Sequence, residues 1–189
     1  FDGYSPGVFT IGGLIAYLEN RDGNCNVRFK QAETHRRFFE MMSSSGIHVR
    51  SFRADCGSYS EDIVKVVMEH TEKFYIRAER YAGLYEKVKR QTGWTTVEIG
   101  FQHYDVQSFP FESFEDVKHC RLVVQRQRKQ KGEQLDLFDG EYTYRCILTN
   151  DWDMTDEEII LHYNKRGSAE QVFDDMNNGF GWSRLPKSF

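Results

Sequence analysis

The pattern of hydrophobic and polar residues along the chain predicts an alternation of strands and helices. Apolar and β-branched runs predict strands at residues 8–19, 25–30, 48–54 and 73–80, with a hairpin turn at Asp22-Gly23 between the first two. Helical signals mark residues 35–42, capped by Thr34 and ended by the 43–46 loop, and residues 61–70, capped by Ser60. The order β-β-α-β-α-β predicts a mixed α/β sheet with helices packed on its faces.

The pattern changes after residue 81. A short helix at 84–91 precedes three runs of period-two alternation, at residues 95–106, 120–129 and 141–151. No helix-length periodic segment separates them, so we expect an antiparallel β insertion outside the main sheet. The expected division is a first core part at 1–93, the insertion at 94–151, and a second core part at 152–189 that carries a long helix.

That helix is expected from Met154 to Phe180. Thr155 with Glu158 three residues later is typical of a capping box, the signature of a helix start. Four polar residues, spaced by three, four and seven positions, fall on one face of the helix; they are Tyr163, Arg166, Glu170 and Asn177. The stripe indicates either a functional site or an ordinary amphipathic helix with an Arg166–Glu170 ion pair.

Composition narrows the class of protein. A chain of 189 residues with 39% apolar and 15% aromatic residues is one domain, or one domain with an insertion, and it can bury a core. The net charge of −4 means that any surface for nucleic acid must be local. Four scattered cysteines favour free thiols over a zinc site or disulfides. With neither an 18-residue apolar run nor a signal peptide, we expect a soluble cytoplasmic protein.

Two carboxylates stand out as candidate metal ligands. Asp55 ends the predicted strand at 48–54, and Glu170 lies on the C-terminal helix. A strand-end carboxylate beside one from a packed helix is how metal-dependent nucleases hold hard cations, although a two-metal site needs a third carboxylate. The alternative for Asp55 is a turn or a helix cap ahead of Ser58.

Three motifs in order resemble DDE transposases of bacterial insertion sequences, the insertion-sequence family-four superfamily. Tyr163, Arg166 and Glu170 match that family's Tyr–Arg–Glu–Lys signature in type and spacing. Residues 53–59, RADCGSY, resemble the segment around its second catalytic Asp, and residues 3–6, GYSP, resemble the segment just after its first. The C-terminal GFG and RLP also fit one branch, so the resemblance covers nearly the whole chain.

The resemblance implies a ribonuclease-H-like fold interrupted by a β insertion between the second Asp and the Glu. It implies DNA strand cleavage and strand transfer with two Mg²⁺ (or Mn²⁺) ions, for which Asp55 and Glu170 are both catalytic residues and metal ligands. Arg166 then binds phosphate or positions Glu170, and Tyr163 hydrogen-bonds a phosphate near the cut. The first catalytic Asp has no counterpart, since we do not assign that role to Asp2. We therefore expect the 189 residues to be an inactive fragment.

The resemblance also implies contacts to DNA. Asn177 stands where the signature has a lysine that holds a phosphate. Lys165 and a basic run in the insertion, of which Arg126, Arg128 and Lys129 are the core, are candidates for gripping the DNA backbone. The alternative for the run, which begins at Arg121 and ends at Lys131, is a solvated hairpin edge that is kept charged to prevent aggregation.

The implied partners are the transposon ends and target DNA, which a homodimer binds. The resemblance implies no membrane partner, and it places the protein in the bacterial cytoplasm, at the nucleoid. Trp94 and Trp152 could stack on an unpaired base, but the core is the more usual place for tryptophans beside an insertion. Two other functions remain open: a ribonuclease-H-like nuclease without strand transfer, and a degenerate transposase that only binds DNA.

Overall fold

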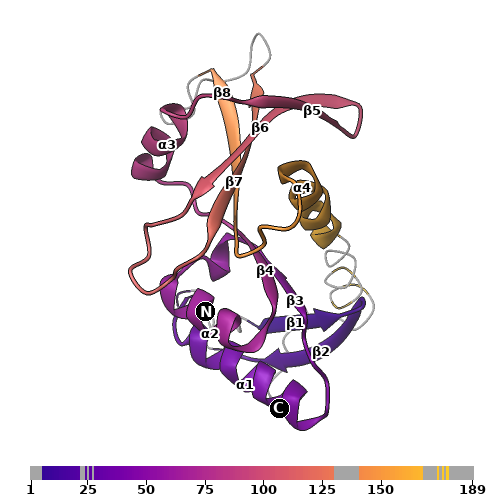
Figure 1. Ribbon diagram of the computed structural model, residues 1–189. Helices are drawn as coiled ribbons and strands as arrows, with labels where there is room; N and C mark the ends of the chain where they lie inside the picture. Colours follow the sequence, from indigo (N-terminus) through magenta and orange to yellow (C-terminus); the bar gives the residue numbers. More distant parts are fainter. Residues whose placement is uncertain are drawn as a thin grey trace. The chain divides into compact units, whose positions relative to one another are not determined.

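The computed structural model describes residues 6–21, 24, 26, 28–129, 141–167, 174, 176 and 178 (Figure 1). The chain divides into two compact units. Unit 1 comprises Phe1–His48 with Asn164–Phe189, and unit 2 comprises Val49–Tyr163. Within the described residues, no helix is both long and apolar enough to span a membrane.

Unit 1 contains a hairpin and a helix. The hairpin joins β1 (Gly7–Ile11) to β2 (Leu14–Glu19) through Gly12 and Gly13, whose φ values are +59° and +84°. Glycine reaches these angles without a Cβ clash, so the chain reverses there. The single strand predicted over 8–19 is therefore wrong. The returning strand at 25–30 is also wrong, since residues 28–30 form a turn; Asp22 and Gly23 lie outside the described residues.

Helix α1 (Gln31–Ser44) begins earlier than its predicted cap, Thr34. Thr34 is buried, and its hydroxyl donates to Glu19 Oε1 at 2.8 Å instead of capping the helix. Arg37 donates to both oxygens of the same carboxylate, at 2.5 and 2.9 Å, and this lowers the pKa of Glu19 to about 2. The predicted cap residue is thus used to fasten the helix to the hairpin.

Unit 2 is built on one six-stranded mixed sheet with the order β3-β4-β8-β7-β6-β5, in which β3 and β4 are parallel and every other pair is antiparallel. The strands are β3 (Ser51–Ala54), β4 (Lys73–Arg77), β5 (Thr95–Ile99), β6 (Gln102–Pro110), β7 (Arg121–Arg128) and β8 (Tyr142–Thr149). The helices are α2 (Glu61–His70), α3 (Ala82–Lys89) and α4 (Asp156–Asn164). Helix α2 has the predicted bounds and the predicted cap, Ser60, which accepts from the Ile63 amide at 3.5 Å. Both strands of the parallel pair are shorter than predicted, and α3 begins two residues before its prediction.

Strands β5 to β8 are antiparallel, as predicted, but they do not lie outside the main sheet. β8 pairs with β4 in the register Tyr75↔Thr149, so the four strands extend the sheet that begins with β3. The pairing satisfies backbone groups of β4 that would otherwise need other partners. The run at 95–106 is itself a hairpin, turned at Gly100 and Phe101 with φ values of +59° and +63°. The domain boundaries proposed from the sequence stay a prediction.

The two faces of this sheet carry different helices (Figure 1). On one face, Ile159 and Ile160 of α4 pack against Val123 and Ile147 in a buried cluster. On the other, α3 places the Tyr85 ring 5.6 Å from that of Tyr144. Strand residues 144 and 147 point to opposite faces because side chains alternate along a strand.

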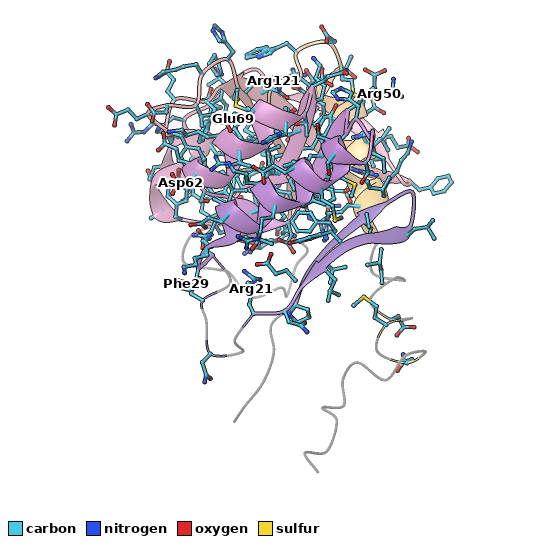
Figure 2. All side chains as sticks on the ribbon, turned by 90° about the horizontal axis from the view of Figure 1, so that it is seen from below. Arg21, Phe29, Arg50, Asp62, Glu69 and Arg121 are labelled. Atoms are coloured by element: carbon cyan, nitrogen blue, oxygen red, sulfur yellow. The ribbon has the colours of Figure 1, made fainter. Side chains whose placement is uncertain are left out.

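Helix α2 has a polar side that is exposed and an apolar side that is buried. Asp62 and Glu69 lie on its exposed side (Figure 2), while Ile63 and Val67 are buried.

A mixed sheet flanked by helices confirms the predicted α/β class and is consistent with a ribonuclease-H-like fold. Among the described residues, Cys56, Cys120 and Cys146 form no disulfide, as predicted; Cys25 lies outside them.

Candidate active site

Asp55 follows β3 directly and begins a tight turn. Its Oδ1 atom accepts a hydrogen bond from the Gly57 amide at 2.9 Å, which caps the short 3₁₀ helix η1 (Cys56–Ser58). The turn interpretation of this aspartate is therefore confirmed. The residue is exposed, and its Oδ2 atom accepts no hydrogen bond from the part of the chain that the structure describes. The cap thus leaves carboxylate lone pairs available to a ligand.

Helix α4 brings Tyr163 to the end of β3. The helix begins with the predicted capping box: the Thr155 amide donates to Glu158 Oε2 at 2.8 Å, and the Glu158 amide donates to Thr155 Oγ1 at 3.2 Å. At its other end, the Tyr163 hydroxyl donates to the Ala54 carbonyl at 3.2 Å. Tyr163 is therefore held one residue away from Asp55 along the strand, on a backbone carbonyl.

Two further contacts join the last turn of α4 to the parallel strands. Arg53 Nη1 donates to the His162 carbonyl at 2.7 Å, and the rings of Tyr75 and His162 lie 4.5 Å apart. Arg53 and Tyr75 are register partners on β3 and β4. The sequence patterns gave neither residue a role, because each contacts His162 across a long stretch of chain. Arg53 lies 109 residues before His162, and Tyr75 lies 87 residues before it, the difference between positions 162 and 75.

The long helix predicted over 154–180 is interrupted after its first part. Helix α4 ends at Asn164 and is followed by a 3₁₀ turn, η2 (Lys165–Gly167), in unit 1. Further on, Asp174 is α-helical and Met176 and Asn178 are π-helical, and the residues around them lie outside the described part of the chain. Lys165 and Arg166 lie in that turn, so the single α-helical face predicted for the signature residues is interrupted. Glu170 and Asn177 lie outside the described residues, as does Asp2.

The arginines of the basic run differ in burial: Arg121 is buried, and Arg128 is exposed. Arg121 is buried; its guanidinium donates to the Asp151 carbonyl at 2.7 Å, to Asp156 Oδ1 at 3.0 Å and to the Met154 carbonyl. Ser108 Oγ lies 3.3 Å from Arg121 Nη1. These bonds tie β7 to the loop that precedes α4, and the side chain is turned away from solvent.

Arg126 is held between two aromatic rings. Its guanidinium carbon lies 4.0 Å from the centre of the Trp94 ring and 4.5 Å from that of Tyr142, and its Nε donates to Asp105 at 3.0 Å. These contacts use the cation–π attraction that stabilises a partly desolvated arginine. Trp94 is therefore a packing residue in this structure.

Arg128 and Lys129 lie further along the run. Arg128 is about 73% exposed and pairs with Glu141 at 3.3 Å, while Lys131 lies outside the described residues. The part of the run in β7 does not form an edge of the sheet, because β7 lies between β6 and β8. At the other end of the unit, Trp152 is half exposed and donates to the His119 carbonyl at 2.8 Å.

A second strand-end aspartate, Asp151, was missed by sequence reasoning. Its Oδ2 accepts from the Tyr75 hydroxyl at 2.6 Å, and its Oδ1 accepts from the amides of Asp153 and Met154. Burial by itself raises the pKa of Asp151, but these bonds and nearby Lys73 lower it overall. Burial, together with this bond, raises the pKa of Tyr75. Both carboxylate oxygens of Asp151 therefore accept hydrogen bonds from the protein.

The donor set can be tested against a divalent cation. Carboxylate oxygens suit hard cations such as Mg²⁺, and Asp55 offers such an oxygen at an exposed strand end. Within the described residues there is no cluster of three or more His, Cys, Asp or Glu side chains that could hold a metal. Asp55 thus fits as one ligand of such an ion.

An exposed carboxylate such as that of Asp55 is the kind of ligand that holds metal ions in enzymes that transfer phosphoryl groups. The family model of the transposase DDE domain matches residues 13–188, and the chain belongs to this family. Proteins of the family act on DNA and normally use divalent metal ions. No curated protein matches the chain.

Proposed function

We propose that this chain provides catalytic residues for the cutting and joining of DNA strands during transposition of a bacterial insertion sequence of the family-four type. The observation that carries the proposal is the exposed, partly unoccupied carboxylate of Asp55 at the end of β3, in a chain of the DDE family. The Tyr163 hydroxyl on the adjacent carbonyl supports it, because this residue belongs to the same signature.

In this proposal Asp55 and Glu170 hold two Mg²⁺ or Mn²⁺ ions. When bound, such ions stabilise negative charge on the attacking and leaving oxygens of a phosphoryl transfer. In cleavage, the oxygen of water bonds to phosphorus while the bond to the 3′-oxygen breaks, leaving a 3′-hydroxyl and a 5′-phosphate. In joining, that 3′-hydroxyl attacks a target phosphate and displaces the target's own 3′-oxygen.

The remaining signature residues bind DNA. Arg166 and Lys165 bind backbone phosphates, and Tyr163 hydrogen-bonds a phosphate near the cut after its hydroxyl leaves the Ala54 carbonyl. Arg128 and Lys129 extend the contact along β7; Arg126 adds charge from its aromatic sandwich, and Asn177 contributes an uncharged contact. The partners are the transposon ends and target DNA, the complex contains two copies of the chain, and it acts at the nucleoid.

The test is strand cleavage and strand transfer by the protein that the complete gene encodes, with Mn²⁺ and labelled terminal-repeat DNA. We expect Asp55→Asn to reduce cleavage by about a thousandfold, because several kcal/mol of charge stabilisation depends on the metals. The matched control is Asp62→Asn, which removes an exposed carboxylate of α2 and should leave cleavage unchanged.

The same assay separates the two alternatives. Cleavage without any joined product indicates a hydrolytic nuclease. Tight DNA binding without cleavage, in a protein that includes the complete reading frame, indicates a binding protein, an outcome that the Asn177 departure favours. Equal loss of cleavage in Asp55→Asn and Asp62→Asn would contradict the proposed site.

A further inference from the structure

Arg53 makes a contact that none of the proposed DNA or metal roles uses. It lies on β3, two residues before Asp55, and its Nη1 donates at 2.7 Å to the His162 carbonyl in the last turn of α4. Both residues belong to unit 2, and the side chain of Arg53 is half-buried.

The His162 carbonyl lies in the last turn of α4, which ends at Asn164. Arg53 gives this carbonyl a charge-assisted hydrogen bond from a side chain. A guanidinium at this end also meets the negative pole of the helix dipole. Arg53 therefore supplies two stabilising interactions that an apolar side chain at the same place could not.

The contact occurs beside the candidate active site. The next residue in α4, Tyr163, donates to the Ala54 carbonyl, and Ala54 separates Arg53 from Asp55. In one of these hydrogen bonds the strand donates to the helix, and in the other the helix donates to the strand. Together they fix the end of α4 against the end of β3, at the point from which the chain continues to Arg166 and Glu170.

We infer that Arg53 is a positioning residue, which holds the last turn of α4 so that the Tyr163 hydroxyl stays on the carbonyl of Ala54, the residue before Asp55. The inference rests on the proposed function in one respect, since the purpose of the arrangement is the site at Asp55. The fastening itself, of α4 to β3 by one guanidinium, does not depend on that function.

The experiment compares Arg53→Met, which keeps the aliphatic stem, with Arg53→Lys, which keeps the charge but loses the planar donor. Hydrogen exchange of the full chain reports the amides of residues 159–164. We expect exchange there to rise about tenfold in Arg53→Met, which corresponds to about 1.4 kcal/mol, and less in Arg53→Lys. The matched control, Arg90→Met at the C-cap of α3, should leave these amides unchanged.

A second readout addresses the site. The probe is Tb³⁺, a hard cation that prefers oxygen ligands and whose luminescence is excited through a nearby tyrosine ring. The contribution of Asp55 is defined as the luminescence that is lost when Asp55→Asn is added to the parent chain or to each variant. We expect this contribution to fall several-fold in Arg53→Met, to be partly rescued in Arg53→Lys, and to be unchanged in Arg90→Met.

The outcomes separate the inference from the proposed function. Unchanged exchange at residues 159–164 in Arg53→Met would overturn the inference. So would an unchanged Asp55-dependent signal in that variant where the parent chain gives one. A parent chain with no Asp55-dependent signal would count against the metal site alone, and faster exchange in Arg53→Met would then still support the fastening of α4. Should Arg53→Met fail to fold, Arg53→Lys provides both readouts, and wild-type values in it would overturn the inference.

Discussion

Asp55 and Asp151 make the same local turn and end in opposite situations. Both follow a strand of the same sheet, and in each the Oδ1 atom accepts from the amide two residues on, at 2.9 Å. Asp55 is exposed, whereas Asp151 is only 3% exposed and its Oδ2 is taken by the Tyr75 hydroxyl. The comparison teaches that a strand-end aspartate is a candidate ligand only where the tertiary structure leaves an oxygen unused.

The largest effect expected from this comparison is the presence or absence of catalysis. As it stands, the 189-residue chain should bind DNA weakly and with strong salt dependence, but should not nick it with Mg²⁺ or Mn²⁺, because the signature supplies only two of three carboxylates. The measurement is nicking of supercoiled DNA over a range of metal concentrations. Metal-dependent nicking that Asp55→Ala abolishes would show that a third ligand, such as Asp2, is already present.

The next effect is on stability, and it separates the two aspartates. Asp151→Asn should lower the free energy of unfolding by about 2–4 kcal/mol, because an amide NH₂ replaces the oxygen that accepts from the Tyr75 hydroxyl and the charge paired with Lys73 is lost. Asp55→Asn should change it by less than about 0.5 kcal/mol, since asparagine also caps such turns. Urea unfolding followed by tryptophan fluorescence measures both, since Trp94 and Trp152 lie in unit 2. Similar losses in the two variants would break the comparison.

A smaller difference is expected between the tyrosines of the two regions. Tyr75→Phe removes a hydrogen bond to a carboxylate and should cost about 2 kcal/mol. Tyr163→Phe removes a longer bond, of 3.2 Å, to a backbone carbonyl and should cost about 1 kcal/mol or less. The same unfolding assay reports both values. A larger loss for Tyr163→Phe would indicate that the end of β3 bears more of the stability than the Asp151 network.

The smallest effect is the pH dependence that Asp151 contributes. Its folded-state pKa lies below the ordinary 3.8, so its stabilising effect is present above that pH and is lost as the pH falls below it. Between about pH 5 and about pH 3, stability should therefore fall more steeply in the wild-type chain than in Asp151→Asn. Parallel curves would show that this carboxylate does not contribute to acid sensitivity.

The features that the sequence predicted correctly depend on residues a few positions apart. The bounds of α2, the capping box of Thr155 and Glu158, and the placement of Asp55 at a strand end all follow from signals within about three residues. The hairpin of unit 1 was misplaced because two glycine-containing pairs competed, and the Gly12-Gly13 pair lay inside an apolar run that reads as one strand.

The site was harder to predict because its contacts are long-range. Arg121 reads as part of a basic run, yet its partners lie 30 to 35 residues further on and turn it inward. Asp151 has the same local sequence signal as Asp55, and only the packing of Tyr75 and Lys73 distinguishes them. A strand-end position can be read from sequence, but the occupation of its oxygens cannot.

The pairing of β4 with β8 has a consequence for the order in which unit 2 folds. Tyr75 and Thr149 are register partners although 74 residues separate them, as the difference of their positions gives. On the ribosome, β3, α2 and β4 emerge long before β8, so one edge of β4 has no partner until most of the chain has been synthesised. Loop closure over such a separation slows folding, and the waiting edge is open to pairing with another chain. The pairing of β4 with β8 is thus the contact that joins the parallel strands β3 and β4 to the antiparallel strands β5 to β8.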